Sequence, residues 1–400
     1  MAVLSVLAAL AVLLGAIHFG FRYVTRSWPF SRSGPLPPLP HLHWKSPVNT
    51  NPNIKSRNSG GKRRVAVTGG SGFLGKCLLD ELLQTMPPSD LLVVDLFPPQ
   101  GAHQAIPFFK FNISDSSEEN IALMAKRLEG FDSVIHCAGI VSLAPRPELI
   151  HSVNVVGTAV MLNASYDARV SSFIGISSAA ILCSKSRPTR KAKESDPVPS
   201  DPVSIYATSK VEAEKLILEA NSAHFSTAVV RFPGLYGIED RMIAEKIVKG
   251  EFPGAPRGGK QCWCYVKNAA YGLALLSRKL IDSPATASGH AYYMGDGEPH
   301  DIIEFWNGFL ALEGKGRKLN LVPYALAYSV ALLSEGLFHY FCGYYRWELL
   351  NFNRAALAHV VQEYYFNQSK AVQVLGYQPP FSSRDAFEEI LAYYRSKKII

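Results

Sequence analysis

A glycine-rich turn between a short apolar run and a longer amphipathic run constrains the fold of this chain more than any other feature. Residues 64–83 read RVAVTGGSGFLGKCLLDELL, which predicts a strand over 65–68, then a turn, then a helix. Gly69 permits the tight bend, Gly72 lets the backbone approach a pyrophosphate, and Gly75 lets the helix pack closely on the strand. Because a helix N-terminus attracts phosphate, this pattern predicts a dinucleotide-binding site.

A second predicted strand, over 91–97, carries the acidic residue that such a site uses. Asp95 follows Gly75 by twenty residues, and a carboxylate there accepts hydrogen bonds from the adenosine ribose hydroxyls. The same carboxylate repels a 2′-phosphate, which favours NAD over NADP. The predicted cofactor-binding residues of this half of the chain are Gly69, Gly72, Phe73, Leu74, Gly75, Asp95, Asp115 and Ala138.

Further strand patterns over 108–115, 131–139 and 170–180 alternate with helical patterns. This alternation predicts an α/β fold, with a doubly wound parallel sheet of the NAD-binding Rossmann type over 64–231.

Residues 204–214, SIYATSKVEAE, contain a tyrosine and a lysine whose spacing has a chemical use. Tyr206 and Lys210 lie four residues apart and therefore share one face of a helix. A nearby ammonium favours the phenolate, so Tyr206 can take a proton from a substrate hydroxyl while a hydride leaves to nicotinamide. Tyr206 and Lys210 are also predicted to contact the cofactor, since Lys210 can hydrogen-bond the nicotinamide ribose. The hydroxyl that orients the substrate oxygen is Ser177 or Ser178. Such spacing usually marks a solvated helix face, but its place after the glycine turn favours catalysis.

Together these motifs resemble the extended branch of the short-chain dehydrogenase/reductase family. TGGSGFLG is similar to its TGxxGxxG element, ISSAA to its catalytic-serine strand end, and YATSK to its YxxSK element. The resemblance implies that Tyr206 is the acid/base, Lys210 its partner and Ser178 the third catalytic residue. The segment RFPGLYGIED resembles the RPxxxYG element of the family, which implies that Pro233 lies along the nicotinamide.

The closing segment, 352–382, resembles the 3β-hydroxysteroid dehydrogenase/isomerase family, which includes the sterol 4α-carboxylate decarboxylating dehydrogenases. This resemblance implies NAD-dependent oxidation of a 3β-hydroxyl on a sterol or steroid, followed by Δ5–Δ4 isomerisation or by loss of a 4α-carboxylate. Two alternatives stay open. One is a dehydrogenase or reductase of another lipid or isoprenoid alcohol, and the other is a non-catalytic NAD-binding membrane scaffold, which the complete Ser-Tyr-Lys set disfavours.

The positive charge of the chain lies at its N-terminal end. Residues 1–64 contain nine Lys or Arg and no acidic residue, which leaves 32 basic and 33 acidic residues in 65–400 and gives no reason to expect nucleic acid as a partner. The apolar run within 1–21 predicts a transmembrane anchor, and the basic residues after it place the catalytic part in the cytosol. A cleaved signal peptide is the alternative, but no basic residue precedes the run. Residues 22–63, basic and rich in proline, predict a flexible linker.

The rest of the chain is expected to hold a substrate lid over 232–318, a membrane-associated helical segment over 319–345, and a closing segment with a cytosolic tail over 346–400. We expect the apolar stretch 322–341 to dip into the membrane beside the lid; a span and a buried helix are the alternatives. Lys397 and Lys398 match a dilysine signal for the endoplasmic reticulum. The six cysteines are expected to be free thiols, no metal site is expected, and a homodimer is one possible assembly.

Overall fold

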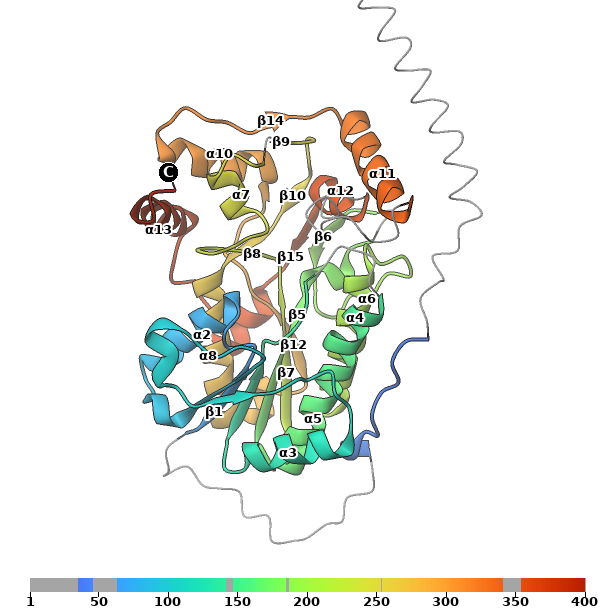
Figure 1. Ribbon diagram of the computed structural model, residues 1–400, viewed down its shortest axis with the longest axis vertical. Helices are drawn as coiled ribbons and strands as arrows, with labels where there is room; N and C mark the ends of the chain where they lie inside the picture. Colours follow the sequence, from blue (N-terminus) through green and yellow to red (C-terminus); the bar gives the residue numbers. More distant parts are fainter. Residues whose placement is uncertain are drawn as a thin grey trace, which may run out of the picture. The chain divides into compact units, whose positions relative to one another are not determined.

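The centre of the fold is a seven-stranded sheet in which every neighbouring pair of strands is parallel. It is seen in a computed structural model that describes residues 35–45, 63–141, 147–184, 187–252, 254–340 and 354–399. The strand order is β12-β7-β5-β4-β1-β2-β3 (Figure 1). The strands are β1 (Val65–Thr68), β2 (Leu91–Asp95), β3 (Phe108–Lys110), β4 (Ser133–His136), β5 (Ser172–Ser178), β7 (Ser226–Phe232) and β12 (His290–Tyr293).

The strand order reverses beside β1, and this reversal positions the ligand site. The chain first builds β1, β2 and β3 outward in one direction, then returns to add β4 on the other side of β1. In open parallel sheets, ligands bind outside the carboxyl ends of the strands at such a switch point. The predicted doubly wound parallel sheet is therefore confirmed.

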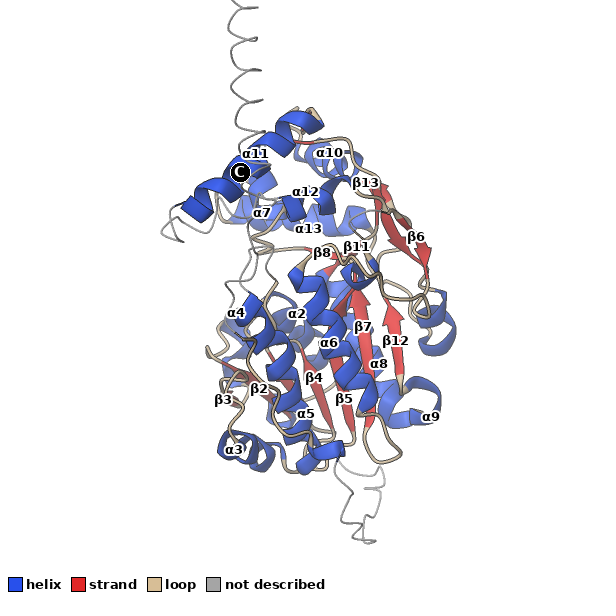
Figure 2. Ribbon diagram, turned by 90° about the vertical axis from the view of Figure 1, so that its right-hand side faces the viewer, coloured by secondary structure: helices blue, strands red, loops and turns tan. Residues whose placement is uncertain are grey.

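Both faces of the sheet are covered by helices because its strands are apolar on both sides. In β1, Val65 and Val67 pack into one hydrophobic cluster and Ala66 into the other. Helices α2 (Phe73–Leu83) and α8 (Val266–Asp282) cover the first face. Helices α3 (Glu118–Leu128), α5 (Gly157–Asp167) and α6 (Ile205–Glu219) cover the second, and Figure 2 shows α5 and α6 in front of the strands.

A second group of elements, called the upper layer here, lies beyond the carboxyl ends of the strands in both views (Figures 1 and 2). It holds a four-stranded sheet in the order β13-β10-β15-β6 and a core of aromatic rings that includes Phe305, Trp306 and Phe387. Its larger elements are β6 (Thr189–Ala192), α7 (Ala244–Val248), β10 (Lys260–Gln261), β13 (His300–Asp301), α10 (Ile302–Glu313), α11 (Tyr324–Tyr340), α12 (Arg354–Val361), β15 (Tyr364–Phe366) and α13 (Ser383–Ser396). The layer also holds the paired strands β8 (Gly234–Tyr236) with β11 (Trp263–Tyr265) and β9 (Gly254–Ala255) with β14 (Asn320–Leu321). The short helices η1 (His43–Lys45), α4 (Pro147–His151) and α9 (Pro284–Ala287) lie outside it.

The upper layer is assembled from interleaved parts of the chain. The range 232–318, predicted as one lid, also contains α8 and β12, which return to the central sheet. Conversely, β6 and β15 lie outside that range and pair with each other in the upper sheet. Parallel strands need long crossover connections, and in this chain several of those connections add strands or helices to the upper layer. The boundaries of a substrate lid stay a prediction.

The structure describes part of the linker predicted over 22–63 but not the anchor predicted over 1–21. The anchor predicted over 1–21 lies outside the described residues, and within the described ranges no helix combines the length and apolar content needed to cross a bilayer. Inside the range predicted as a flexible linker, Leu42 and Trp44 pack against the cluster between α3, α5 and the sheet. The structure thus differs from the linker prediction at this point, because two apolar side chains and a short helical turn give the segment a docking face.

Candidate active site

The glycine turn after β1 has the geometry that its sequence predicts. Gly69 has a φ of +68°, and a Cβ there would lie 2.7 Å from the backbone nitrogen of Ala138. A Cβ on Gly75 would lie 2.1 Å from the carbonyl oxygen of Gly69. Gly72 is the N-cap of α2 and offers no side chain to cap it. The turn can therefore close only with glycine at Gly69 and Gly75, and the first N–H groups of α2 can face an anionic ligand.

Asp95 ends β2 beside this turn. One carboxylate oxygen accepts a hydrogen bond from the backbone N–H of Ser71 at 3.1 Å, and the other accepts one from Phe97 N–H at 3.2 Å. The Ser71 hydroxyl donates to the Phe97 carbonyl at 2.7 Å. The carboxylate is thereby held at the strand end next to the glycine turn, where a ribose would lie.

Four other predicted cofactor residues have different surroundings. Ala138 donates its backbone N–H to the Thr68 hydroxyl at 3.1 Å, which ties the turn after β4 to the end of β1. Phe73 lies near the turn that follows β8, since its ring would be 3.4 Å from a Cβ on Gly237, whereas Leu74 is buried in the core. Asp115 accepts from Ser117 N–H at 3.1 Å in the turn before α3, and these hydrogen bonds lower its pKa. The cofactor roles of these residues stay predictions.

Ser178, Tyr206 and Lys210 come together where β5 ends and α6 begins. Tyr206 and Lys210 are buried on one face of α6, and the Ser204 hydroxyl caps that helix by accepting from Ala207 N–H at 3.2 Å. The Lys210 Nζ donates to the Ile176 carbonyl at 2.9 Å and lies 5.9 Å from the centroid of the Tyr206 ring. One face of the helix thus carries both groups against the end of β5.

The electrostatics of this group follow from its burial. Burial raises the pKa of Tyr206 to about 12, and a hydrogen bond with Ser178 acts in the opposite direction. Burial also lowers the pKa of Lys210 to about 8. Of the two serines left open by the residues alone, Ser178 is the one that faces Tyr206. Ser177 points to the other side of the strand, where its buried hydroxyl has no hydrogen-bond partner among the described residues.

Asn154 is a site residue that the sequence analysis did not predict. It lies in a π-helical turn, Ser152–Val156, and its side chain both accepts from and donates to the backbone of Ile140, at 2.8 Å and 3.0 Å. It also donates to the Ser209 hydroxyl at 3.1 Å, and that hydroxyl donates to the Tyr206 carbonyl at 2.8 Å. Asn154 therefore joins the turn after β4 to the helix of Tyr206. The available signal was an amide inside an otherwise apolar run, VNVVGTAVML.

Pro233 follows the end of β7, on the same edge of the sheet as the groups above. Arg231, the last residue but one of β7, forms a buried ion pair with Glu214 of α6, with both carboxylate oxygens 3.1 Å from the Arg231 Nε. This contact fixes the strand that leads into Pro233 against the helix of Tyr206 and Lys210.

The residues at this edge fit NAD. The N-terminus of α2 has no side-chain cap, and glycines let the backbone come close to a ligand there, which suits a pyrophosphate. The Asp95 carboxylate at the end of the next strand suits the hydroxyl pair of a ribose. Among the described residues no three His, Cys, Asp or Glu side chains are grouped so as to hold a metal ion. The described cysteines are all free thiols, as expected.

Comparison with known proteins decides the family. A model of the 3-beta hydroxysteroid dehydrogenase/isomerase family matches residues 66–320, which is more than half of the chain. The chain belongs to this family. It is an NAD-dependent oxidoreductase that acts on CH–OH groups, and the predictions of the family, of its NAD cofactor and of enzymatic activity are confirmed.

Three curated relatives cover most of the chain. A 4-hydroxy-2-methyl-3-oxo-4-farnesyl-3,4-dihydroquinoline-1-oxide ketoreductase of Stigmatella aurantiaca is 28% identical over 78% of this chain and 91% of its own. A 3-beta-hydroxysteroid dehydrogenase of Mycolicibacterium neoaurum is 28% identical over 83% of this chain and 91% of its own. The mouse sterol-4-alpha-carboxylate 3-dehydrogenase, decarboxylating, is 26% identical over 82% and 89%. The names of these relatives thus describe different substrates.

The fold also matches solved structures. MoeE5, solved in complex with UDP-glucuronic acid and NAD, superimposes with a TM-score of 0.64 at 18% identity, over 84% of this chain and 99% of MoeE5. At this identity the likeness supports the fold alone.

The Gly75 contact leads to a test of the cofactor site. Gly75→Ala places a methyl group against the Gly69 carbonyl, so the turn must open, and we expect NADH to bind at least about tenfold more weakly. Fluorescence titration with NADH measures this change. Gly308→Ala is the matched control, since its Cβ would meet nothing closer than 3.9 Å. Equal NADH affinity in Gly75→Ala and the wild type would contradict the assignment of this turn to the cofactor.

Proposed function

We propose that this family member oxidises a 3β-hydroxyl group of a sterol or steroid to a ketone, with Tyr206 as the base. The observation that carries the proposal is the convergence of Ser178, Tyr206 and Lys210 at the edge of the sheet that also holds the glycine turn and Asp95. The names of two curated relatives, a 3-beta-hydroxysteroid dehydrogenase and a sterol-4-alpha-carboxylate 3-dehydrogenase, support the choice of substrate class.

Each of the three side chains has a role in moving the hydroxyl proton. Ser178 orients the substrate oxygen, and Tyr206 takes its proton. A tyrosine whose pKa burial has raised to about 12 is a weak base near neutral pH, so it needs a positive charge close by. Lys210 provides that charge from the next turn of α6. When NAD is bound, it supplies the acceptor for the hydride that leaves the carbinol carbon.

Two reactions can follow from a 3-ketone. A 4α-carboxylate beside the ketone is a β-keto acid, which loses carbon dioxide without a further acid or base. Isomerisation of a Δ5 double bond instead needs a second proton-transferring group. The described residues give no basis for naming that group, so both sequels stay open.

A second candidate function is the reduction of a ketone on an isoprenoid-bearing substrate. The relative that favours it is the Stigmatella aurantiaca enzyme, whose name describes a farnesyl substrate and a ketoreductase. The same Ser178, Tyr206 and Lys210 would then act in the opposite direction, with Tyr206 donating its proton to the forming alkoxide.

Helix α11 supports a lipid substrate and contact with a membrane. Leu326, Val330 and Leu333 are 56%, 47% and 52% exposed along its outer side. Its inner side is small, with Ala327 and Ala331 buried in one cluster with Leu357 of α12. The helix therefore packs on the protein through small alanine side chains and exposes large apolar side chains on its outer side. This distribution suits a helix that lies in one leaflet of a bilayer. We therefore propose that α11 dips into the membrane beside the site. The homodimer and the endoplasmic reticulum location stay predictions.

The substrate class is tested by turnover with purified full-length chain. We expect NADH to form from NAD with a 3β-hydroxysterol, its 4α-carboxylated form, or both, and release of carbon dioxide identifies the decarboxylating sequel. Tyr206→Phe should lower turnover by about 10²-fold or more and leave NADH affinity unchanged. Tyr166→Phe, on α5 away from this edge, is the control.

Reduction of a farnesylated ketone, with no turnover of any 3β-hydroxysterol, would decide for the second candidate. Wild-type turnover in Tyr206→Phe would contradict the mechanism.

The membrane role of α11 is tested in a chain that lacks residues 1–21. Such a chain should still float with lipid vesicles, because α11 provides an apolar contact of its own. Replacing Leu326, Val330 and Leu333 with serine should release most of it into the soluble fraction. Replacing the exposed Leu123, Leu149 and Val198 of the same chain controls for a general loss of apolar surface. Complete release by removal of 1–21 alone would contradict the role of α11.

A further inference from the structure

Residues 37–45, called the strap here, lie along the outer side of α5. The strap ends in the short helix η1, and its Leu42 and Trp44 pack against the cluster formed by α3, α5 and the sheet. Every residue of α5 from 157 to 165 is buried, although the sheet covers only the inner side of that helix. The strap thus supplies an apolar cover that α3 and α6 leave incomplete.

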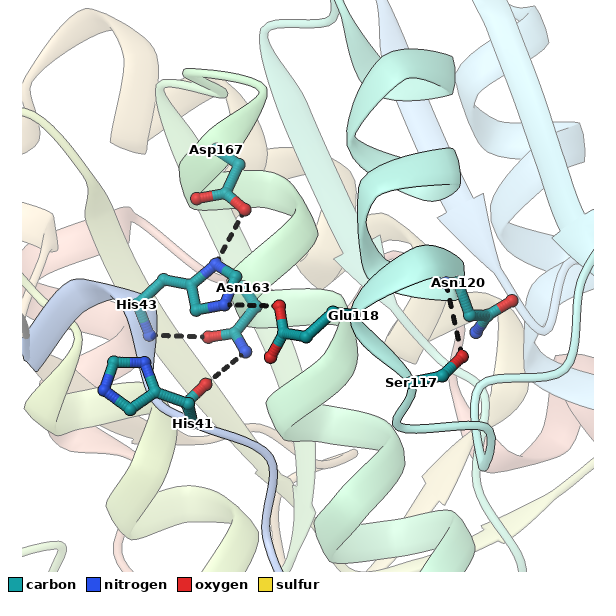
Figure 3. A network of polar contacts seen from close by, with 7 residues as sticks. All are labelled: His41, His43, Ser117, Glu118, Asn120, Asn163 and Asp167. Atoms are coloured by element: carbon teal, nitrogen blue, oxygen red, sulfur yellow. Dashed lines mark hydrogen bonds and ion pairs between the residues drawn. The ribbon is translucent and has the colours of Figure 1, made fainter.

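Polar contacts fix the register of the strap (Figure 3). The backbone N–H of His43 donates to the side-chain oxygen of Asn163 at 3.0 Å, and the Asn163 amide donates back to the His41 carbonyl at 2.7 Å. Asn163 is fully buried, so its amide is committed to the strap. The His43 ring nitrogens lie 2.7 Å from a carboxylate oxygen of Asp167 and 3.2 Å from one of Glu118. These two contacts are ion pairs when the ring is protonated.

The strap joins three helices. Glu118 belongs to α3, and Asn163 and Asp167 belong to α5. Lys45 adds an ion pair with Glu219 at the end of α6, with 2.7 Å between Nζ and the carboxylate oxygen. The strap therefore docks specifically. Its two apolar side chains and its reciprocal backbone bonds with the buried Asn163 amide can form only if the segment keeps one register along α5.

We propose that the strap shortens the tether between the catalytic domain and the membrane. This rests on the N-terminal anchor predicted over 1–21. A tether that is free as far as residue 62 has 41 residues and a full reach of about 140 Å, at about 3.4 Å per residue. With the strap docked, only residues 22–36 remain between anchor and domain, and the full reach falls to about 50 Å.

The strap runs toward the part of the domain that carries α11. In Figure 1 the strap, in blue, rises from η1 along the side of α5 toward the upper layer. Helix α11, with its exposed apolar face, belongs to that layer in both views (Figures 1 and 2). The strap therefore holds the domain close to the bilayer, and its docked end points toward the layer that carries α11.

The test measures the distance between domain and bilayer in vesicles that contain the full chain. All chains carry the serine substitutions of Leu326, Val330 and Leu333, so that the tether alone sets the distance. A donor dye at the exposed residue Glu129 transfers energy to acceptors on lipid headgroups. The strap is released by Leu42→Ser with Trp44→Ser or, more mildly, by Glu118→Gln with Asp167→Asn. The matched controls are Leu39→Ser, an exposed leucine of the strap, and Glu119→Gln, an exposed neighbour of Glu118.

Hydrogen exchange of the strap amides confirms docking and release in the same samples. We expect slow exchange at His43 in the wild type and both controls, and fast exchange in the release variants, because its N–H is bonded to Asn163. Release lengthens a coil-like tether about 1.7-fold, so energy transfer should fall by roughly half.

Three results would overturn the proposal, and they are distinguishable. Exchange at His43 that is equally fast in wild type and release variants would show that the strap is not docked. Fast exchange in the release variants with unchanged energy transfer would show that docking does not set the distance. A chain with the three serine substitutions and an intact strap that does not float with vesicles would remove the anchor itself, and with it the shortened tether.

Discussion

The buried ion pair between Glu214 and Arg231 is the interaction on which the site depends. Glu214 lies on α6, two turns beyond Tyr206 and one turn beyond Lys210, and Arg231 is the last residue but one of the strand that leads to Pro233. Arg231 also donates to the hydroxyl of Tyr293 on β12 and to the carbonyl of Glu194, both at 3.2 Å. Loss of one partner would leave a charge buried, at a cost of about 3–5 kcal/mol, so helix and strand are held together strongly.

Helix α6, held in place by this ion pair, brings together the cofactor part and the Ser-Tyr-Lys part of the candidate site. The glycine turn and Asp95 belong to the strands on one side of the switch point, and Ser178 and Tyr206 belong to the other. Two contacts connect them: Asn154 joins the backbone after β4 to the helix of Tyr206 through Ser209, and Ala138 in that same turn donates its backbone N–H to Thr68 at the end of β1. A bound cofactor and the tyrosine proposed to transfer the proton can meet only if these parts keep their spacing, and these polar contacts maintain it.

The parts of this structure that depend on local chemistry were predictable from the sequence. The glycine turn requires particular residues at fixed spacing, and Tyr206 and Lys210 share a helix face by periodicity alone. Contacts between distant segments were not predictable. The pairing of β6 with β15 and the docking of Trp44 on α5 depend on tertiary packing that local patterns do not encode. The choice between Ser177 and Ser178 needed the direction of the side chains at the end of β5, which the order of residues leaves open.

The most direct test of the proposed chemistry follows a labelled hydrogen. A 3β-hydroxysterol with deuterium on C3 is incubated with the full-length chain and NAD, and the sterol and the cofactor are analysed by mass spectrometry. Oxidation at C3 predicts that the 3-ketone appears without the label and that the reduced cofactor carries one deuterium for each ketone formed. A sterol recovered with its deuterium intact, from protein that still turns over another alcohol, would contradict it.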